Sequence, residues 1–96
     1  MDNKSIARIN WVPTEQGGKK RFPLTKYSTA AHFHADEEGQ DWSVVLNIIS
    51  NHDNYETLCS MKFLFPDKAP GNLLVVGSKF ELYELGKVAD GEIIES

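Results

Sequence analysis

Two histidines separated by a single residue are the most obvious candidates for chemistry in this chain. His32 and His34 lie on the same side of a segment that alternates like a β-strand, which would place their imidazoles about 6.6–7 Å apart along it. Imidazoles so arranged could bind one metal ion, with Asp36 or His52 completing the coordination shell. The alternative is that both point outward as ordinary polar residues, since no third ligand stands at a fixed spacing. We therefore predict no bound cofactor and keep the pair as candidate metal ligands.

Catalytic chemistry has little support among the remaining reactive side chains. Cys59 is the only cysteine, and it shares one face of its segment with Met61, Phe63 and Phe65, a pattern that favours a place in the core. A nucleophile also needs an adjacent base and a third group that orients the base. The acidic run from Asp36 to Asp41 is typical of a solvated turn. We predict that the protein is not an enzyme.

A basic loop is the other candidate site. The residues from Glu15 to Arg21 combine the paired glycines Gly17 and Gly18 with a run of Lys and Arg. Paired glycines let the backbone turn where a residue with a Cβ would be strained. The loop belongs to a longer turn-rich segment from Pro13 to Lys26, and loops of this length in a compact domain are more often functional than decorative. It presents concentrated positive charge on an otherwise acidic protein.

Length and composition indicate one soluble domain covering residues 1–96. The 96 residues suffice for a single hydrophobic core, and the net charge of -4 argues against a uniformly basic nucleic-acid-binding surface. A single cysteine excludes an intrachain disulfide and fits a reducing compartment. Residues 1–4 are expected to be flexible, the N-terminus lacks the apolar segment of a signal peptide, and no apolar run approaches the roughly 20 residues needed to cross a bilayer. We predict a cytoplasmic protein that makes no membrane contact.

Period-two alternation dominates the chain and predicts β-strands. From Ser5 to Val12, for example, Ala7, Ile9 and Trp11 share one face. There is no convincing amphipathic helix, and six or seven short strands favour a small barrel over a sandwich, because closure removes exposed strand edges. The predicted strands are Ser5–Val12, Tyr27–Ala35, Trp42–Ser50, Thr57–Phe65, Leu73–Val76, Phe80–Leu85 and Lys87–Glu95, the last one interrupted at Asp90-Gly91.

An ordered set of features extends over nearly the whole chain, from residue 6 to residue 95. A strand ends near Trp11-Val12, a Glu-Gln-Gly-Gly-Lys loop follows, and Phe22-Pro23 precedes Tyr27, which enters a strand containing His32-Phe33. This order resembles the C-terminal (third) β-barrel domain of elongation factor Tu and related translational GTPases. The resemblance implies an all-β fold, a six- to seven-stranded antiparallel Greek-key barrel. Later features that agree with it are Phe65-Pro66, Gly77 before Phe80-Glu81-Leu82, Gly86-Lys87-Val88-Ala89 and Gly91.

The resemblance implies two ways of binding. In the family the matching loop lies on the surface that helps to hold transfer RNA, so Gly18, Lys19 and Lys20 could contact a phosphate backbone. The family's barrel also packs against neighbouring domains, so a free copy has surface available for a protein partner or for self-association. The candidate binding residues in and beside the loop are Gly17, Gly18, Lys19, Lys20, Arg21, Lys26 and Tyr27.

Departures from the family pattern favour protein contacts over RNA. Tyr27 is followed by Ser28-Thr29 where the family has Arg-Pro, and no Gly-x-x-x-x-Gly-Lys-Ser/Thr motif occurs, so we expect no nucleotide binding. We predict a non-enzymatic, stand-alone protein-interaction module. RNA binding through the Gly17–Lys26 loop and a metal protein or small enzyme using His32 and His34 are the alternatives. Candidate exposed aromatic contacts are Trp42, Tyr55 and Tyr83. The alternative for all three is packing in the core or at its rim, which fits Trp42 better.

Overall fold

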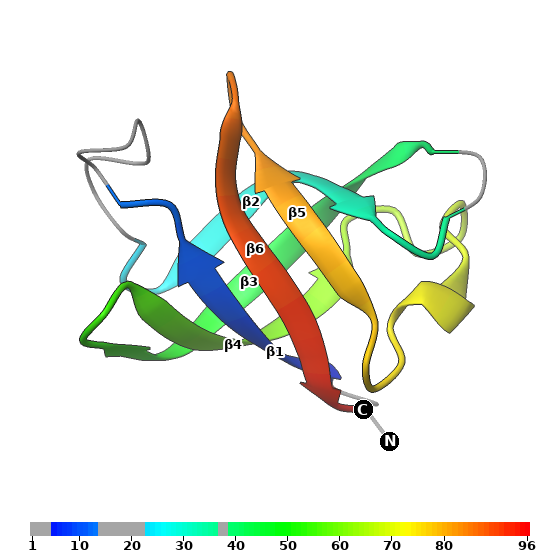
Figure 1. Ribbon diagram of the computed structural model, residues 1–96. Coiled ribbons are helices and arrows are strands. Elements are labelled where there is room, and N and C mark those ends of the chain that lie inside the picture. The colour runs from blue at the N-terminus through cyan, green and yellow to red at the C-terminus, as the bar shows by residue number, and fades with distance from the viewer. Residues whose placement is uncertain (1–4, 14–22, 37–38) are drawn as a thin grey trace.

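Six antiparallel strands close into one barrel (Figure 1). The computed structural model describes residues 5–13, 23–36 and 39–96. Around the barrel the strands follow the order β1, β4, β3, β2, β5 and β6, and β6 pairs back onto β1. Within the described residues the predicted all-β barrel is therefore confirmed. The strand bounds are β1 Ser5–Trp11, β2 Lys26–Phe33, β3 Asp41–His52, β4 Glu56–Phe63, β5 Lys79–Tyr83 and β6 Lys87–Glu95.

The connection from β4 to β5 decides the topology. β2, β3 and β4 follow one another as neighbouring antiparallel strands, and the chain then returns so that β5 pairs with β2. This is the strand order of a Greek key. A short 3-10 helix, η2 (Gly71–Leu73), lies within the returning segment, shown in yellow in Figure 1. Among the described residues, no helix is long and apolar enough to span a membrane.

The strand predicted at residues 73–76 is wrong. Leu73 is the last residue of η2, its N–H donates to the Pro70 carbonyl (3.1 Å), and the chain then turns. The apolar residues of this run do not form one buried strand face. Leu73 is buried in the core, whereas Val75 and Val76 are exposed. A segment that must carry the chain back to β2 cannot stay extended within the sheet.

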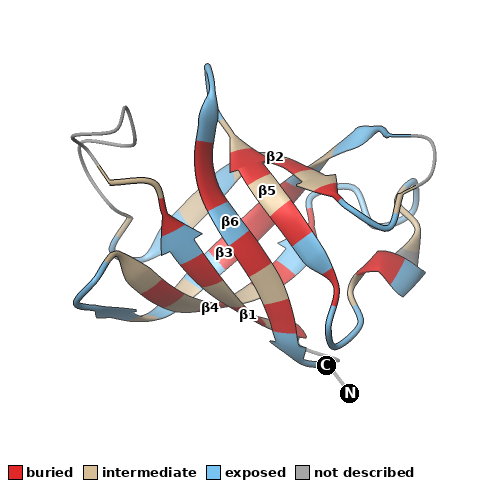
Figure 2. Cartoon of the chain, viewed as in Figure 1, coloured by how far each residue is buried: buried red, intermediate tan, exposed pale blue. Residues whose placement is uncertain are grey.

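Buried residues alternate with less buried ones along β1, β4 and β5, as the coloured bands in Figure 2 show. On β1 the residues Ala7, Ile9 and Trp11 are buried, which confirms the inward face predicted from the sequence. Phe33 and Phe80 meet in the interior with their ring centroids 5.2 Å apart. Removing such apolar surface from water stabilises the fold by roughly 25 cal/mol per Å². The largest fully buried hydrophobic side chains are Phe33, Phe80, Ile9, Leu46, Leu82 and Ile93.

Strand ends differ from the predicted bounds, and one side chain changes face as a result. Cys59 and Phe63 on β4 are buried as predicted, but Phe65, expected on the same face, is 61% exposed. β4 ends at Phe63, so the following residues leave the sheet and no longer alternate with it. β2 likewise ends at Phe33, before the predicted Ala35.

Gly91 makes room for a core aromatic ring. β6 runs through this residue without the predicted break at Asp90-Gly91. Gly91 stands opposite Ile9 on β1 and Phe80 on β5. A Cβ on Gly91 would lie 2.3 Å from two ring carbons of Phe80, whose side chain is itself fully buried. The position therefore requires glycine because the barrel has no space for a larger residue.

We predict that Gly91→Ala lowers the free energy of unfolding by about 1–3 kcal/mol, because overpacking displaces the buried Phe80 ring. Gly86→Ala is the matched control, since no atom lies within 4 Å of a Cβ built there. Urea unfolding followed by tryptophan fluorescence measures both variants against the wild type. Equal stability of the two variants would contradict the packing argument.

Candidate functional site

A concave surface lies where the turn between β2 and β3 faces the connection between β4 and β5. An open cavity of about 580 Å³ occupies this end of the barrel. Asp36 and Trp42 line it from the β2–β3 side, and Asp67, Lys68 and Leu73 line it from the β4–β5 connection. The two walls thus come from segments that are distant in the sequence.

Trp42 also borders a second, smaller cavity of about 190 Å³. This cavity is lined by Phe65 and Asp41, and it shares Trp42, Lys68 and Ala69 with the first. We call the two adjoining cavities together the Trp42 groove. The groove therefore runs past both an indole and an exposed phenyl ring.

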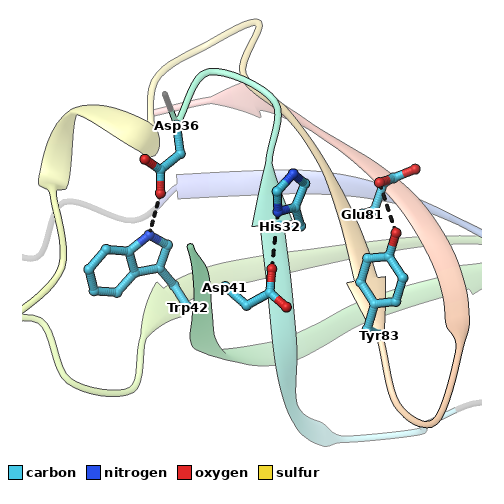
Figure 3. Close-up of polar contacts among 6 residues, drawn as sticks. All are labelled: His32, Asp36, Asp41, Trp42, Glu81 and Tyr83. Atoms are coloured by element: carbon cyan, nitrogen blue, oxygen red, sulfur yellow. Dashed lines mark hydrogen bonds and ion pairs between the residues drawn. The ribbon is translucent and has the colours of Figure 1, made fainter. Parts of the chain in front are cut away.

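Two contacts fix the indole of Trp42. Its Nε1–H donates to Oδ2 of Asp36 (2.9 Å; Figure 3), and its ring packs edge-on against Phe63 with centroids 6.3 Å apart. The turn that carries Asp36 is held by hydrogen bonds from the Asp36 N–H to the Phe33 carbonyl (3.1 Å) and from the Gly39 N–H to the Asp36 carbonyl (3.0 Å). Gly39 has a φ of 68°, a left-handed conformation that glycine adopts without steric cost. The aromatic surface is therefore preformed.

Negative charge outweighs positive charge in the groove. Asp36, Asp41 and Asp67 line it, whereas Lys68 is the only basic residue among the described lining residues. Asp41 also contacts His32, whose Nδ1 lies 3.0 Å from Oδ1 of that carboxylate (Figure 3). The described lining residues of the groove thus carry three carboxylates and one ammonium group, although Asp36 already accepts the Trp42 indole hydrogen bond and Asp41 contacts His32.

The candidate metal shell around His32 and His34 is not assembled among the described residues. Asp36 accepts the indole hydrogen bond described above, and His52 lies at the far end of β3, where its Nε2 is 2.8 Å from Oγ of Ser50. In the part of the chain that the structure describes, no group of three or more His, Cys, Asp or Glu side chains is placed to hold a metal ion.

The basic loop falls mostly outside the described residues. The two candidate residues that the structure does describe, Lys26 and Tyr27, begin β2 at the end remote from the Trp42 groove. The candidates that lie outside the description, within residues 14–22, are Gly17, Gly18, Lys19, Lys20 and Arg21. Their role in binding stays a prediction.

Tyr27 links β2 to the turn between β5 and β6. Its hydroxyl donates a hydrogen bond to the Glu84 carboxylate, and its ring packs edge-on against Trp11 with centroids 5.7 Å apart. Burial and the Glu84 contact raise the pKa of the Tyr27 phenol well above its ordinary range. Lys26, by contrast, is exposed. The contacts of Tyr27 thus give it a structural role at this end of the barrel.

Cys59 is fully buried, which confirms its predicted place in the core. Its Sγ lies 3.8 Å from the Ala7 carbonyl oxygen, and burial raises the pKa of the thiol to about 12. The thiolate, not the thiol, is the nucleophile. The geometry therefore keeps this side chain in its unreactive form.

An ion-pair cluster on β5 and β6 was not predicted from the sequence. Nζ of Lys87 lies 3.0 Å from Oε2 of Glu81 and 2.8 Å from Oδ1 of Asp90. The Tyr83 hydroxyl donates to Oε1 of Glu81 (3.0 Å; Figure 3). The Lys87 hydrogen bond lowers the pKa of Glu81, and burial opposes that effect. These charged and polar groups pair with one another at the surface of the barrel. Surface ion pairs of this kind contribute little to the stability of the fold.

The groove itself was not predicted from the sequence. Phe65 was expected to point inward, and Asp67 and Lys68 carried no pattern of their own. The available signal was the long connection between β4 and β5, because loops of this length are often functional. The candidate aromatic contacts Trp42, Tyr55 and Tyr83 are all half-buried. Trp42 packs against the core, as the sequence favoured, and Tyr55 does so too.

The chain matches no protein-family model, no curated protein and no solved structure. The similarity to the third domain of elongation factor Tu therefore rests on the ordered sequence features and stays a prediction.

We predict that Cys59 in the folded protein resists dithiodipyridine, whereas the unfolded chain reacts fast. Raising the thiol pKa from 9.0 to about 12 leaves roughly a thousandfold less thiolate near neutral pH. The same pKa shift also makes stability depend on pH. As the pH rises from about 9 towards 12, the thiol of the unfolded chain loses its proton before that of the folded protein, so the free energy of unfolding falls. Reaction rates with and without guanidinium chloride check the first expectation, and rapid labelling of the folded protein would contradict it.

Proposed function

We propose that the protein is a non-enzymatic binding module that contacts a protein partner through the Trp42 groove. The observation that carries this proposal is the ring of Phe65, 61% exposed and bordering a cavity with the half-buried Trp42. Charged residues line the same cavities: Lys68 borders both of them, and Asp67 borders the larger one beside Trp42. Aromatic side chains at the centre of a polar rim are typical of the residues that dominate protein interfaces.

The frame around the groove supports this function because it holds the contact residues in place. Trp42 is fixed by Asp36 and Phe63, and the Leu64 N–H donates to the Ser43 carbonyl (2.9 Å), which ties the segment before Phe65 to β3. Side chains that are already ordered lose less entropy when a partner binds. A rigid groove therefore suits a binding module.

The chemistry of the reactive side chains supports a non-enzymatic role. Cys59 is buried with a raised thiol pKa, and His32 is paired with Asp41. Ser50 and His52 form a hydrogen-bonded pair on the exposed end of β3, away from the groove. Within the described residues, no third group orients His52 as nucleophilic catalysis requires.

The proposed relationship to the third domain of elongation factor Tu is supported by the closed antiparallel barrel and its Greek-key strand order. In that family the barrel packs against neighbouring domains, so its surface is suited to protein contacts. The unpaired, buried Cys59 supports a reducing, cytoplasmic location. A shared barrel does not by itself transfer a function, so the groove carries the proposal.

RNA binding through the Gly17–Lys26 loop stays an untested alternative. Metal binding at His32 and His34 is less favoured, because no third ligand from the described residues is placed beside them. Lys26 begins β2, whereas the groove lies beyond the other end of that strand, so loop variants and groove variants test separate surfaces. Changing Lys19, Lys20 and Arg21 to Ala would abolish salt-dependent RNA binding if the loop carried it.

We predict that Phe65→Ser abolishes capture of the protein partner and that Val76→Ser leaves it intact. The two side chains are exposed to nearly the same degree, 61% and 62%, so each substitution removes an exposed apolar group at little cost to folding. Wild type and both variants serve as bait in an extract of the source cell, and mass spectrometry compares the bound proteins. Light scattering of the three purified proteins measures self-association.

A bound protein or a dimer that is present with wild type and Val76→Ser and absent with Phe65→Ser would support the proposal. Identical bound proteins with all three baits, together with a monomer by light scattering, would contradict it.

A further inference from the structure

The lining of the Trp42 groove has the chemistry of a cation-binding surface. Asp36 and Asp67 border the larger cavity from different segments, and Asp41 borders the smaller one. Trp42 lines both cavities, and Phe65 lines the smaller one together with Asp41. The whole chain adds to this local excess with a net charge of -4, which steers positive ligands towards the protein.

Arginine is the side chain that uses both kinds of lining group. Its planar guanidinium stacks on aromatic faces and donates paired hydrogen bonds to carboxylates. The electron-rich face of an aromatic ring also attracts the positive charge directly, most strongly for tryptophan. Lysine offers a compact, strongly hydrated ammonium that lacks the planar fork.

We propose that the Trp42 groove binds an arginine-bearing segment of a protein partner, with the guanidinium beside Trp42 and the Asp67 carboxylate. This inference rests on the proposed function, because it names the chemistry of the partner that the groove takes. An acidic segment would meet the carboxylate excess. A purely apolar segment would remove Asp67 and Lys68 from water without a partner, which is unfavourable.

Lys68 opposes a bound cation. It borders both cavities, and it is the only basic residue among their described lining residues. Removing its charge therefore strengthens arginine binding, whereas removing the charge of Asp67 weakens it. Opposite changes in affinity at these two neighbouring residues would show that the groove selects for charge. Disruption of the surface would instead weaken binding in both variants.

The test is a titration of ¹⁵N-labelled full-length protein with three synthetic peptides in which glycine alternates with arginine, lysine or glutamate. The chain has two tryptophans, so two indole N–H signals report on two environments. We expect the arginine peptide to shift the Trp42 signal more than the lysine peptide does, and the glutamate peptide to leave it unchanged. The Trp11 signal is the internal control, because its Nε1–H is buried and donates to Oγ1 of Thr57 (2.7 Å).

Four variants locate the charge selectivity. We expect Asp67→Asn to weaken binding of the arginine peptide about two- to fivefold and Lys68→Ala to strengthen it by a similar factor, as for an exposed ion pair. Asp53→Asn and Lys62→Ala change the net charge in the same way at exposed positions outside the groove lining, so we expect neither to change the affinity.

A Trp42 signal that does not respond to the arginine peptide, or that responds equally to the lysine peptide, would overturn the inference. Equal effects of Asp67→Asn and Asp53→Asn would overturn it too, since attraction would then come from net charge alone. A groove that binds the glutamate peptide while Phe65→Ser still abolishes partner capture would refute the arginine assignment and leave the interaction function standing. Arginine binding without any Phe65-dependent partner or self-association would refute that function instead.

Discussion

The pairing of the first strand with the last is the constraint on which this barrel depends. β1 hydrogen-bonds to both β4 and β6, so each of the six described strands has two neighbours in the barrel. Closure in this way removes the edge strands that an open sheet would expose. Closure also limits the interior. The backbone of Gly91 lies against the ring of Phe80, which packs on Phe33, and a side chain at residue 91 would not fit. A single glycine thus sets how closely β5 and β6 wrap the core.

A closed barrel has no free edge strand on which a partner could extend the sheet, which favours contacts through a face or an end of the barrel. The Greek-key return from β4 to β5 builds such an end, because it carries Phe65, Asp67 and Lys68 past the turn between β2 and β3. Trp42 stands at the start of β3, where this returning segment meets it. The candidate binding groove is therefore a product of the topology. Its charge combines Asp36 and Asp41 from the acidic run with Asp67 and Lys68, which belong to no sequence pattern.

Local alternation in the sequence was enough to predict most of the fold. In a half-buried strand, successive side chains point to opposite faces, so apolar and polar residues alternate along the chain. The inward face of β1, with Ala7, Ile9 and Trp11, and the burial of Cys59 were both predicted correctly. The same rule failed at Phe65, because alternation does not reveal where a strand leaves the sheet. The apolar run at residues 73–76 failed for a related reason, since an apolar residue can anchor a turn as well as a strand.

The amino-acid sequence by itself thus determined the all-β class, the inward faces of the strands and the acidic character of the chain. Each of these depends only on the composition or on residues that are neighbours in the sequence. Only the tertiary structure decided that Gly91 is needed for the space beside Phe80 and that β6 continues through it. Only the tertiary structure brought Asp36 and Trp42 to the same cavity as Asp67. The physical reason is shared: these are contacts between segments far apart in the chain, and they exist only once the barrel has closed.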